Sequence, residues 1–145
     1  MPLENSNFKE SFFKTMELLQ KKTDKIIYYE YKGGDVDEDY IVLVNILKMA
    51  RELCQIAIKY TDGTQINAVI DVSDKKISIA VQDNGSGFDY NKVAKVTKGQ
   101  GLSMIRDRVY IFGGTFKVTR NKKDGMRFDI SIPLKHKEKQ MTEMG

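Results

Sequence analysis

Residues 39–60 are rich in apolar side chains, and the polar residues among them recur at a regular spacing. Five of these polar positions are separated by 3, 4, 3 and 4 residues. In an α-helix this spacing places side chains along one face. A helix with a single polar stripe must be covered on its other sides, so the sequence predicts a helix at the centre of a domain. The stripe consists of Asn45, Lys48, Glu52, Gln55 and Lys59.

The segments around this helix predict strands and two further helices. Apolar residues at helical spacing predict helices over 8–22 and 102–112, and β-branched, aromatic or alternating residues predict strands. The sequence predicts a loop over 83–101 with weak helical content at 89–95. The expected strands are 25–31, 65–72, 75–82, 115–120 and 126–133.

The resulting order, αβαββαββ, predicts an α/β two-layer sandwich. Two of its strand pairs are hairpins, with turns at Ser73-Asp74 and at Asp124-Gly125. Such an order favours a mixed, largely antiparallel sheet with helices on one face.

Composition excludes several classes of protein. A length of 145 residues fits one domain with a core of its own. The chain has no run of 18 apolar residues, and its start is polar, so neither a membrane span nor a signal peptide is expected. A single cysteine, Cys54, excludes an internal disulfide and fits a cytoplasmic setting. The net charge is +4, but the basic clusters lie apart without interleaved aromatic residues, so nucleic-acid binding is not expected.

The run DNGSGFD, Asp83 to Asp89, follows a predicted strand and contains more glycine than a tight turn requires. A hairpin turn needs only Asn-Gly. An aspartate fixed at the end of a strand can accept a hydrogen bond from a planar amine such as that of adenine. Gly85 and Gly87 would let a base lie against the chain. The run therefore indicates a binding loop.

A second glycine-containing run, KGQGLSM over 98–104, lies where a helix is predicted to begin. It lacks the preceding strand of a dinucleotide-binding fingerprint. Free N–H groups at a helix start nevertheless attract phosphate, and Lys92, Lys95 and Lys98 add positive charge. A flexible connector with solvated lysines is the alternative interpretation.

Taken in order, these runs resemble the conserved boxes of the GHKL, or Bergerat-fold, ATPases. RELCQIAIKYTDGTQI resembles the N box, DNGSGFD the G1 box, and GQGLSMIRDRVYIFGG the G2 box. GMRFDISIP resembles the closing glycine-plus-strand element. The resemblance covers roughly residues 20–134. It is closest to the ATP-binding catalytic domain of sensor histidine kinases whose response regulators carry helix-turn-helix output domains.

The resemblance implies ATP and Mg²⁺ as ligands. Asp83 would bind the adenine amine. The other implied nucleotide contacts are Gly85 and Gly87 in the pocket, Phe88 at the start of the lid, and Lys98, Gly99, Gly101 and the backbone of Leu102 at the phosphates.

The N box departs from the family pattern at its metal ligand. Glu52 and Lys59 occupy its acidic and basic positions and would support the phosphates. The asparagine that ligates Mg²⁺ in the family is replaced by Ile56. The remaining candidates for the metal are Gln55, about 100° around the helix, and Glu52. Two outcomes stay open: nucleotide binding with weakened metal dependence, or a degenerate pseudokinase that binds a partner.

The resemblance also implies a phosphate acceptor outside this chain. The single histidine, His136, lies in the basic tail KHKEK. We therefore expect an ATP-binding domain over 25–134, preceded at 1–24 by the end of a linker from a missing dimerization domain and followed by a frayed tail over 135–145. The expected partners are that histidine-containing domain and, indirectly, a response regulator, in a cytoplasmic domain of a sensor that is itself membrane-anchored. An anti-sigma-factor serine kinase is a further alternative.

Overall fold

The computed structural model describes residues 7–89, 102–121, 123 and 125–135, and each predicted element lies within two residues of its expected bounds. The predicted weak helix at 89–95 lies almost wholly outside the described residues. The described helices are α1 (Phe8–Gln20), α2 (Tyr40–Tyr60) and α4 (Leu102–Ile111). The strands are β1 (Ile26–Lys32), β2 (Gln65–Val72), β3 (Lys76–Asp83), β4 (Thr115–Asn121) and β5 (Gly125–Pro133).

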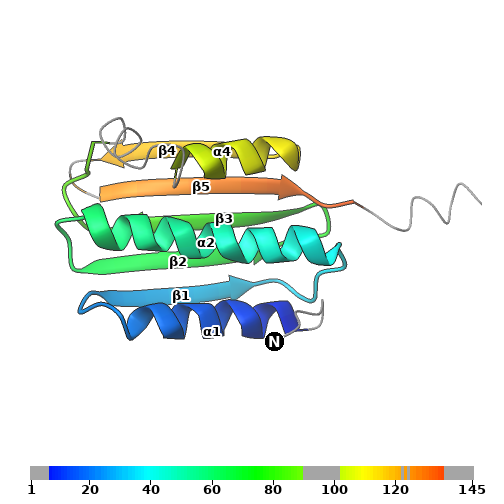
Figure 1. The fold of residues 1–145 in the computed structure, drawn as a ribbon, viewed down its shortest axis with the longest axis horizontal. Helices are drawn as coiled ribbons and strands as arrows, with labels where there is room; N and C mark the ends of the chain where they lie inside the picture. Colours follow the sequence, from blue (N-terminus) through cyan, green and yellow to red (C-terminus); the bar gives the residue numbers. More distant parts are fainter. Residues whose placement is uncertain (1–6, 90–101, 122, 124, 136–145) are drawn as a thin grey trace, which may run out of the picture.

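The five strands form one mixed sheet in the order β1-β2-β3-β5-β4 (Figure 1). β1 and β2 are parallel, with Ile26 opposite Gln65, and the chain passes between them through α2. A parallel pair requires such a crossover, which a helix usually provides. The other three pairings are antiparallel. The predicted two-layer α/β fold with a mostly antiparallel sheet is thus confirmed.

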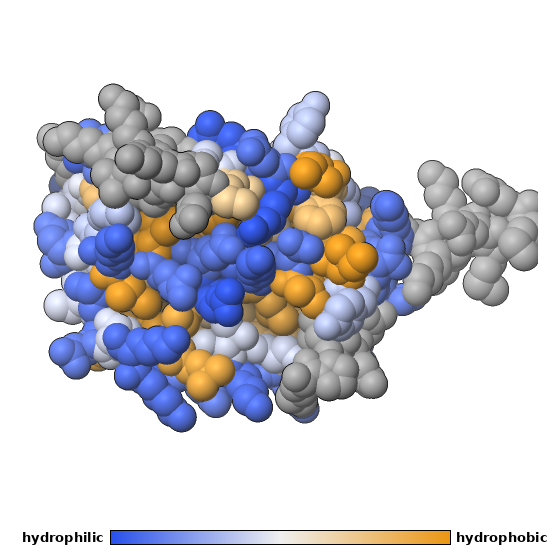
Figure 2. All heavy atoms as spheres, viewed as in Figure 1, coloured by the Kyte–Doolittle hydropathy of each residue, from blue (hydrophilic) through white to orange (hydrophobic). Residues whose placement is uncertain are grey.

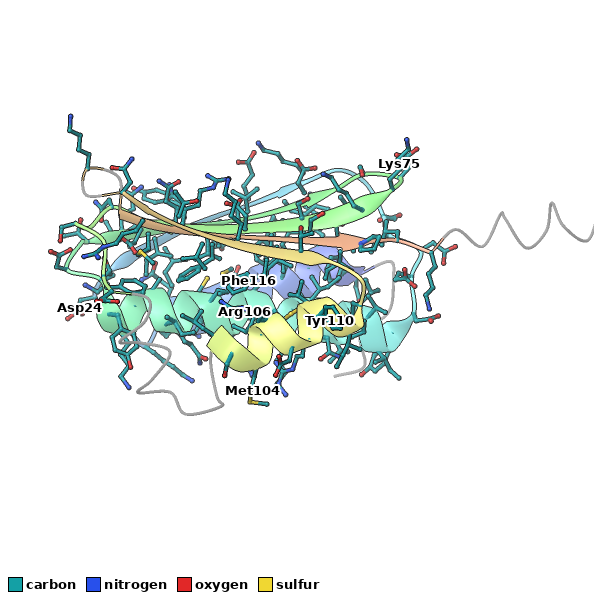
Figure 3. The ribbon with its side chains drawn as sticks, turned by 90° about the horizontal axis from the view of Figure 1, so that it is seen from above. Asp24, Lys75, Met104, Arg106, Tyr110 and Phe116 are labelled. Atoms are coloured by element: carbon teal, nitrogen blue, oxygen red, sulfur yellow. The ribbon has the colours of Figure 1, made fainter. Side chains whose placement is uncertain are left out.

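All three described helices cover the same face of the sheet (Figure 3). The strands supply this face with alternate residues, as the buried positions of β2 and β3 show. Phe116 of β4 points toward the helices, whereas Met104 of α4 points away from the sheet (Figure 3). The apolar layer between helices and sheet is the core.

α2 lies at the centre of that layer and leaves its polar stripe outside. Hydrophilic residues gather over α2 in the middle of the helical face (Figure 2). Cys54 is fully buried, and this burial raises the pKa of its thiol to about 12, which makes it an inert core residue. The eight buried residues of α2 are Leu43, Ile46, Met49, Ala50, Leu53, Cys54, Ile56 and Ala57.

α1 is packed as part of this core. Its apolar positions recur at helical spacing and are 4% exposed or less, namely Phe8, Phe12, Met16 and Leu19. The ring of Phe8 lies 6.1 Å from that of Tyr31, and the ring of Phe12 lies 6.3 Å from that of Tyr29, both on β1. α1 therefore covers the β1 edge of the sheet. Its predicted role as the end of an interdomain linker stays a prediction.

None of the described helices is long and apolar enough to cross a bilayer.

Candidate functional site

Several segments far apart in the sequence meet at one end of the sheet. The C-terminal ends of α2 and β3 and the start of β5 all lie there (Figure 1). Direct contacts join them: the Met126 amide lies 3.4 Å from Asp83, and the Ser86 amide donates to Asp62. The sheet therefore brings the predicted G1 and N boxes together.

Asp83, the last residue of β3, carries a buried carboxylate that is only partly satisfied. Its side chain is 3% exposed. Oδ1 accepts the Gly85 N–H at 2.8 Å and faces the Met126 N–H at a longer 3.4 Å. Oδ2 is buried and finds no hydrogen-bond partner among the residues that the structure describes. A buried oxygen without a partner is costly, so a ligand that donates an N–H at this point is favoured.

The other buried carboxylate of the described chain shows the contrast. Glu38 is 4% exposed, but both of its oxygens are occupied. Oε1 accepts the Asp39 N–H at 2.8 Å, and Oε2 accepts the Lys135 N–H at 2.9 Å. Glu38 thus ties the start of α2 to the end of β5 and has a structural role, whereas Asp83 retains a free acceptor.

Two glycines allow the chain to approach Asp83 closely. Gly125 has a φ of 80°, and a Cβ at this position would collide with both Oδ1 and the carbonyl oxygen of Asp83. A Cβ on Gly85 would meet the Asp62 carboxylate and would lie 2.5 Å from Thr61 Oγ1. Gly85 therefore makes room for the end of α2, a reason for glycine that sequence analysis did not identify.

A row of aromatic rings packs near the end of β3, where Phe128 of β5 lies opposite Val81. The ring of Phe88 is 5.9 Å from that of Tyr60 and 6.1 Å from that of Phe128, which in turn stacks on Phe116 at 6.3 Å. Tyr60 Oη is buried and has no partner among the described residues. These rings form an apolar cluster near the end of the strand that carries Asp83.

The predicted acidic residue Glu52 is held by an arginine. Arg108 Nη1 of α4 lies 3.1 Å from both Oε1 and Oε2 of Glu52, and each side chain is 20% exposed. The pair joins α2 to α4, the helix within the predicted G2 box. Lys59, the predicted basic residue, lies with Nζ 5.3 Å from the ring centre of Tyr60.

The N-box position at which the family has a metal ligand holds an apolar side chain that is buried in the core. Ile56 is 7% exposed and belongs to the core, whereas Gln55 is exposed. In the described part of the chain, no group of three or more His, Cys, Asp or Glu side chains is placed to hold a metal ion. Mg²⁺ at this site would therefore depend on phosphate oxygens and water, which it commonly retains as ligands.

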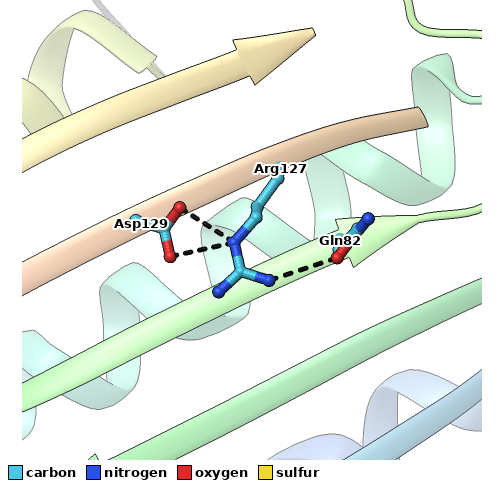
Figure 4. Close-up of polar contacts among 3 residues, drawn as sticks. All are labelled: Gln82, Arg127 and Asp129. Atoms are coloured by element: carbon cyan, nitrogen blue, oxygen red, sulfur yellow. Dashed lines mark hydrogen bonds and ion pairs between the residues drawn. The ribbon is translucent and has the colours of Figure 1, made fainter. Parts of the chain in front are cut away.

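On the face of the sheet away from the helices, side chains of β3 and β5 are joined next to Asp83. Arg127 of β5 binds Asp129 through Nε at 3.1 and 2.9 Å and donates through Nη1 to Gln82 Oε1 at 3.2 Å (Figure 4). Gln82 precedes Asp83 and pairs with Arg127 in the ladder. These partly exposed contacts add little stability, but they tie β5 to the strand end that carries Asp83.

Part of the predicted site lies outside the described residues. This applies to Lys98, Gly99 and Gly101, the expected phosphate contacts. Leu102 is described: it begins α4 and is fully buried. Sequence analysis in turn missed Tyr60, Asp62, Asn84 and the Arg108 pairing of Glu52, because single polar or aromatic residues at element ends carry no signal of their long-range partners.

Comparisons with known proteins agree with this geometry. The sequence matches the family described as "Histidine kinase-, DNA gyrase B-, and HSP90-like ATPase" over residues 42–136, more than half of the chain. The sensor protein VraS of Staphylococcus aureus is 24% identical over 116 residues, which are 80% of this chain and 32% of VraS. VraS of Staphylococcus epidermidis is 23% identical over 120 residues, 83% of this chain and 33% of the relative. The chain thus spans about a third of the length of these curated relatives.

Solved structures show the same fold. The catalytic domain of histidine kinase ThkA superposes with a TM-score of 0.68 at 21% identity, over 88% of this chain and 92% of that domain. Histidine kinase AdeS of Acinetobacter baumannii gives a TM-score of 0.68 at 16% identity, over 89% of this chain and 66% of that one.

Proposed function

Because the chain belongs to the histidine kinase-, DNA gyrase B- and HSP90-like ATPase family, we propose that it binds ATP at the Asp83 end of the sheet. We further propose that it presents the γ-phosphate to a histidine on a separate dimerization domain. The observation that carries this proposal is the buried Oδ2 of Asp83, which lacks a partner among the described residues. An adenine amine placed there would supply the missing donor.

The described residues have separate roles in this proposal. Asp83 accepts the adenine amine, and the rings of Phe88 and Tyr60 pack beside the base. Glu52 and Lys59 support the phosphates from α2, with Glu52 held in place by Arg108. ATP supplies the phosphoryl group, and the chain contributes mainly position and charge, as in other phosphoryl transfers.

The phosphate contacts complete the proposal. Lys98, Gly99, Gly101 and the backbone of Leu102 would surround the phosphates at the start of α4, where free N–H groups favour anions. Gln55, with Glu52 as the second candidate, would help to hold Mg²⁺, which would supply positive charge to the phosphates. The phosphate acceptor would be a partner domain in a cytoplasmic signalling protein, with a response regulator downstream.

Calorimetric titration of ATP and ADP, with and without Mg²⁺, tests nucleotide binding by the domain. Transfer of labelled γ-phosphate to a histidine-containing dimerization domain supplied in trans tests the kinase reaction. We expect saturable ATP binding and an acid-labile label on the partner domain. Absence of binding at millimolar nucleotide would instead identify a pseudokinase that keeps the fold to bind a partner.

Restoring the family's metal ligand by Ile56→Asn is expected to strengthen ATP binding only when Mg²⁺ is present, about tenfold. The same change places an amide in a site that is 7% exposed, so the free energy of unfolding should fall by about 1–3 kcal/mol. Calorimetry at two Mg²⁺ concentrations and urea unfolding measure the two effects.

Ile58→Asn is the matched control, because it makes the same change two residues along α2 on a different side of the helix. It should leave the Mg²⁺ dependence of ATP binding unaltered. An Ile56→Asn variant that is folded but shows no added Mg²⁺ dependence would refute this account of the N box.

A further inference from the structure

The loop after β3 is tied to the turn after α2 by contacts that nucleotide binding does not directly use. Asp62, two residues beyond the end of α2, accepts two hydrogen bonds from Ser86. The Ser86 N–H donates to Oδ1 at 2.8 Å, and the Ser86 hydroxyl donates to Oδ2 at 2.6 Å. Both oxygens of one carboxylate thus hold one residue of the loop.

A second anchor lies on the other side of Gly85. Asn84 Oδ1 accepts the N–H groups of Thr64 and Gln65 at 2.8 and 2.9 Å, and its Nδ2 donates to Thr64 Oγ1 at 3.2 Å. The residues on both sides of Gly85, Asn84 and Ser86, are therefore held in place. Because the Gly85 N–H binds Asp83 Oδ1, the anchors also orient the Asp83 carboxylate.

The charge on Asp62 supports this arrangement. The hydrogen bond from the Ser86 hydroxyl lowers the pKa of Asp62 most, and the hydrogen bond from the Ser86 amide lowers it further. The charge of Lys25 acts in the same direction. Lys25 also donates to the Gly63 carbonyl at 2.7 Å, in the same turn. Asp62 is exposed, so these bonds contribute little to global stability. Their effect is local, on the conformation of one loop.

We propose that Asp62 is a positioning residue for nucleotide binding, an inference that rests on the proposed function. Asp62 acts through Ser86 and holds Gly85 and the Asp83 carboxylate in the binding geometry before the ligand arrives. A loop that is already ordered saves the ordering cost that binding would otherwise carry. Removal of Asp62 should therefore loosen the loop first and weaken binding as a consequence.

A mutant cycle over Asp62 and Ser86 tests this inference. Asp62→Ala should weaken ATP binding about threefold to tenfold and increase amide hydrogen exchange at Ser86 in the nucleotide-free domain. Ser86→Ala removes only the hydroxyl bond and should have a smaller effect. The double variant should match Asp62→Ala, because both changes remove one shared interaction.

Asp62→Asn is the conservative rescue. Its amide oxygen can still accept the Ser86 N–H, and the hydroxyl can rotate to accept from the amide nitrogen. We expect this variant to retain most of the affinity and the protection of the Ser86 amide. Asp74→Ala, an exposed acid in the β2–β3 turn at the other end of the sheet, is the control and should behave as wild type.

The exchange measurement needs no ligand, so it separates this inference from the proposed function. Equal protection of the Ser86 amide in wild type and Asp62→Ala overturns the inference, as does equal ATP affinity. Loss of protection in Asp62→Ala together with no ATP binding by the wild type would contradict the proposed function and leave only the ordering of the loop by Asp62 standing. Should Asp62→Ala fail to fold, the same comparison is made with Ser86→Ala by its ATP affinity, where an unchanged value overturns the inference.

Discussion

Asp83→Asn is expected to weaken ATP binding about 10- to 100-fold, the range for a lost hydrogen bond to a charged group. The orientation of the new amide is set by the protein. The Gly85 N–H, with the Met126 N–H behind it, holds the amide oxygen at the Oδ1 position. The NH₂ group then occupies the Oδ2 position and faces the adenine amine, donor against donor. Calorimetric titration with ATP measures the loss.

The free energy of unfolding of this variant should not fall together with its ATP affinity. The buried Oδ2 lacks a partner among the described residues, so replacing the carboxylate by a neutral amide should not lower the free energy of unfolding. Urea unfolding provides this comparison. Asp71→Asn, at an exposed position of β2, is the control for the chemical change and should leave both quantities unchanged. An Asp83→Asn domain that is folded and binds ATP like wild type would show that Asp83 is not the base contact.

Gly125→Ala is expected to cost about 2–4 kcal/mol of unfolding free energy and to abolish measurable ATP binding. A φ of 80° is strained for alanine, and the added Cβ collides with Oδ1 and the carbonyl oxygen of Asp83. The start of β5 and the end of β3 cannot both keep their positions, so the Asp83 carboxylate is displaced. Urea unfolding and calorimetry measure the two losses.

Gly34→Ala provides the matched control on the same chain. A Cβ at Gly34 meets no described atom within 4 Å. The same substitution there should change the free energy of unfolding by less than about 1 kcal/mol, with a gain as the expected sign. Comparable losses at both positions would mean that the collision with Asp83 does not determine the effect at Gly125.

The helices and strands were predictable because their signals are local. The polar stripe of residues 39–60 and the alternation in 65–72 each follow from the spacing of neighbouring residues. The strand order and the parallel pairing of β1 with β2 were not predicted. Both depend on how a long crossover packs on the sheet, which no short window of sequence determines.

The candidate site shows the same limit. The residue types around Asp83 and their resemblance to a family predicted the binding loop and its carboxylate. They did not predict that Oδ2 lacks a partner, that Arg108 binds Glu52 across 56 residues, or that Ser86 binds Asp62 across 24. These are properties of pairs of residues brought together by the fold, so they become visible only in three dimensions.

The most direct test of this account compares ATP with inosine triphosphate, in which a carbonyl oxygen replaces the exocyclic amine of adenine. If Asp83 Oδ2 accepts a hydrogen bond from this amine, the domain should bind ATP about 100-fold more tightly than inosine triphosphate. The oxygen of inosine would face Asp83 Oδ2 as acceptor against acceptor. Calorimetric titration of both nucleotides into the wild-type domain measures the ratio. Equal affinities would contradict the assignment of Asp83 as the group that recognises the base.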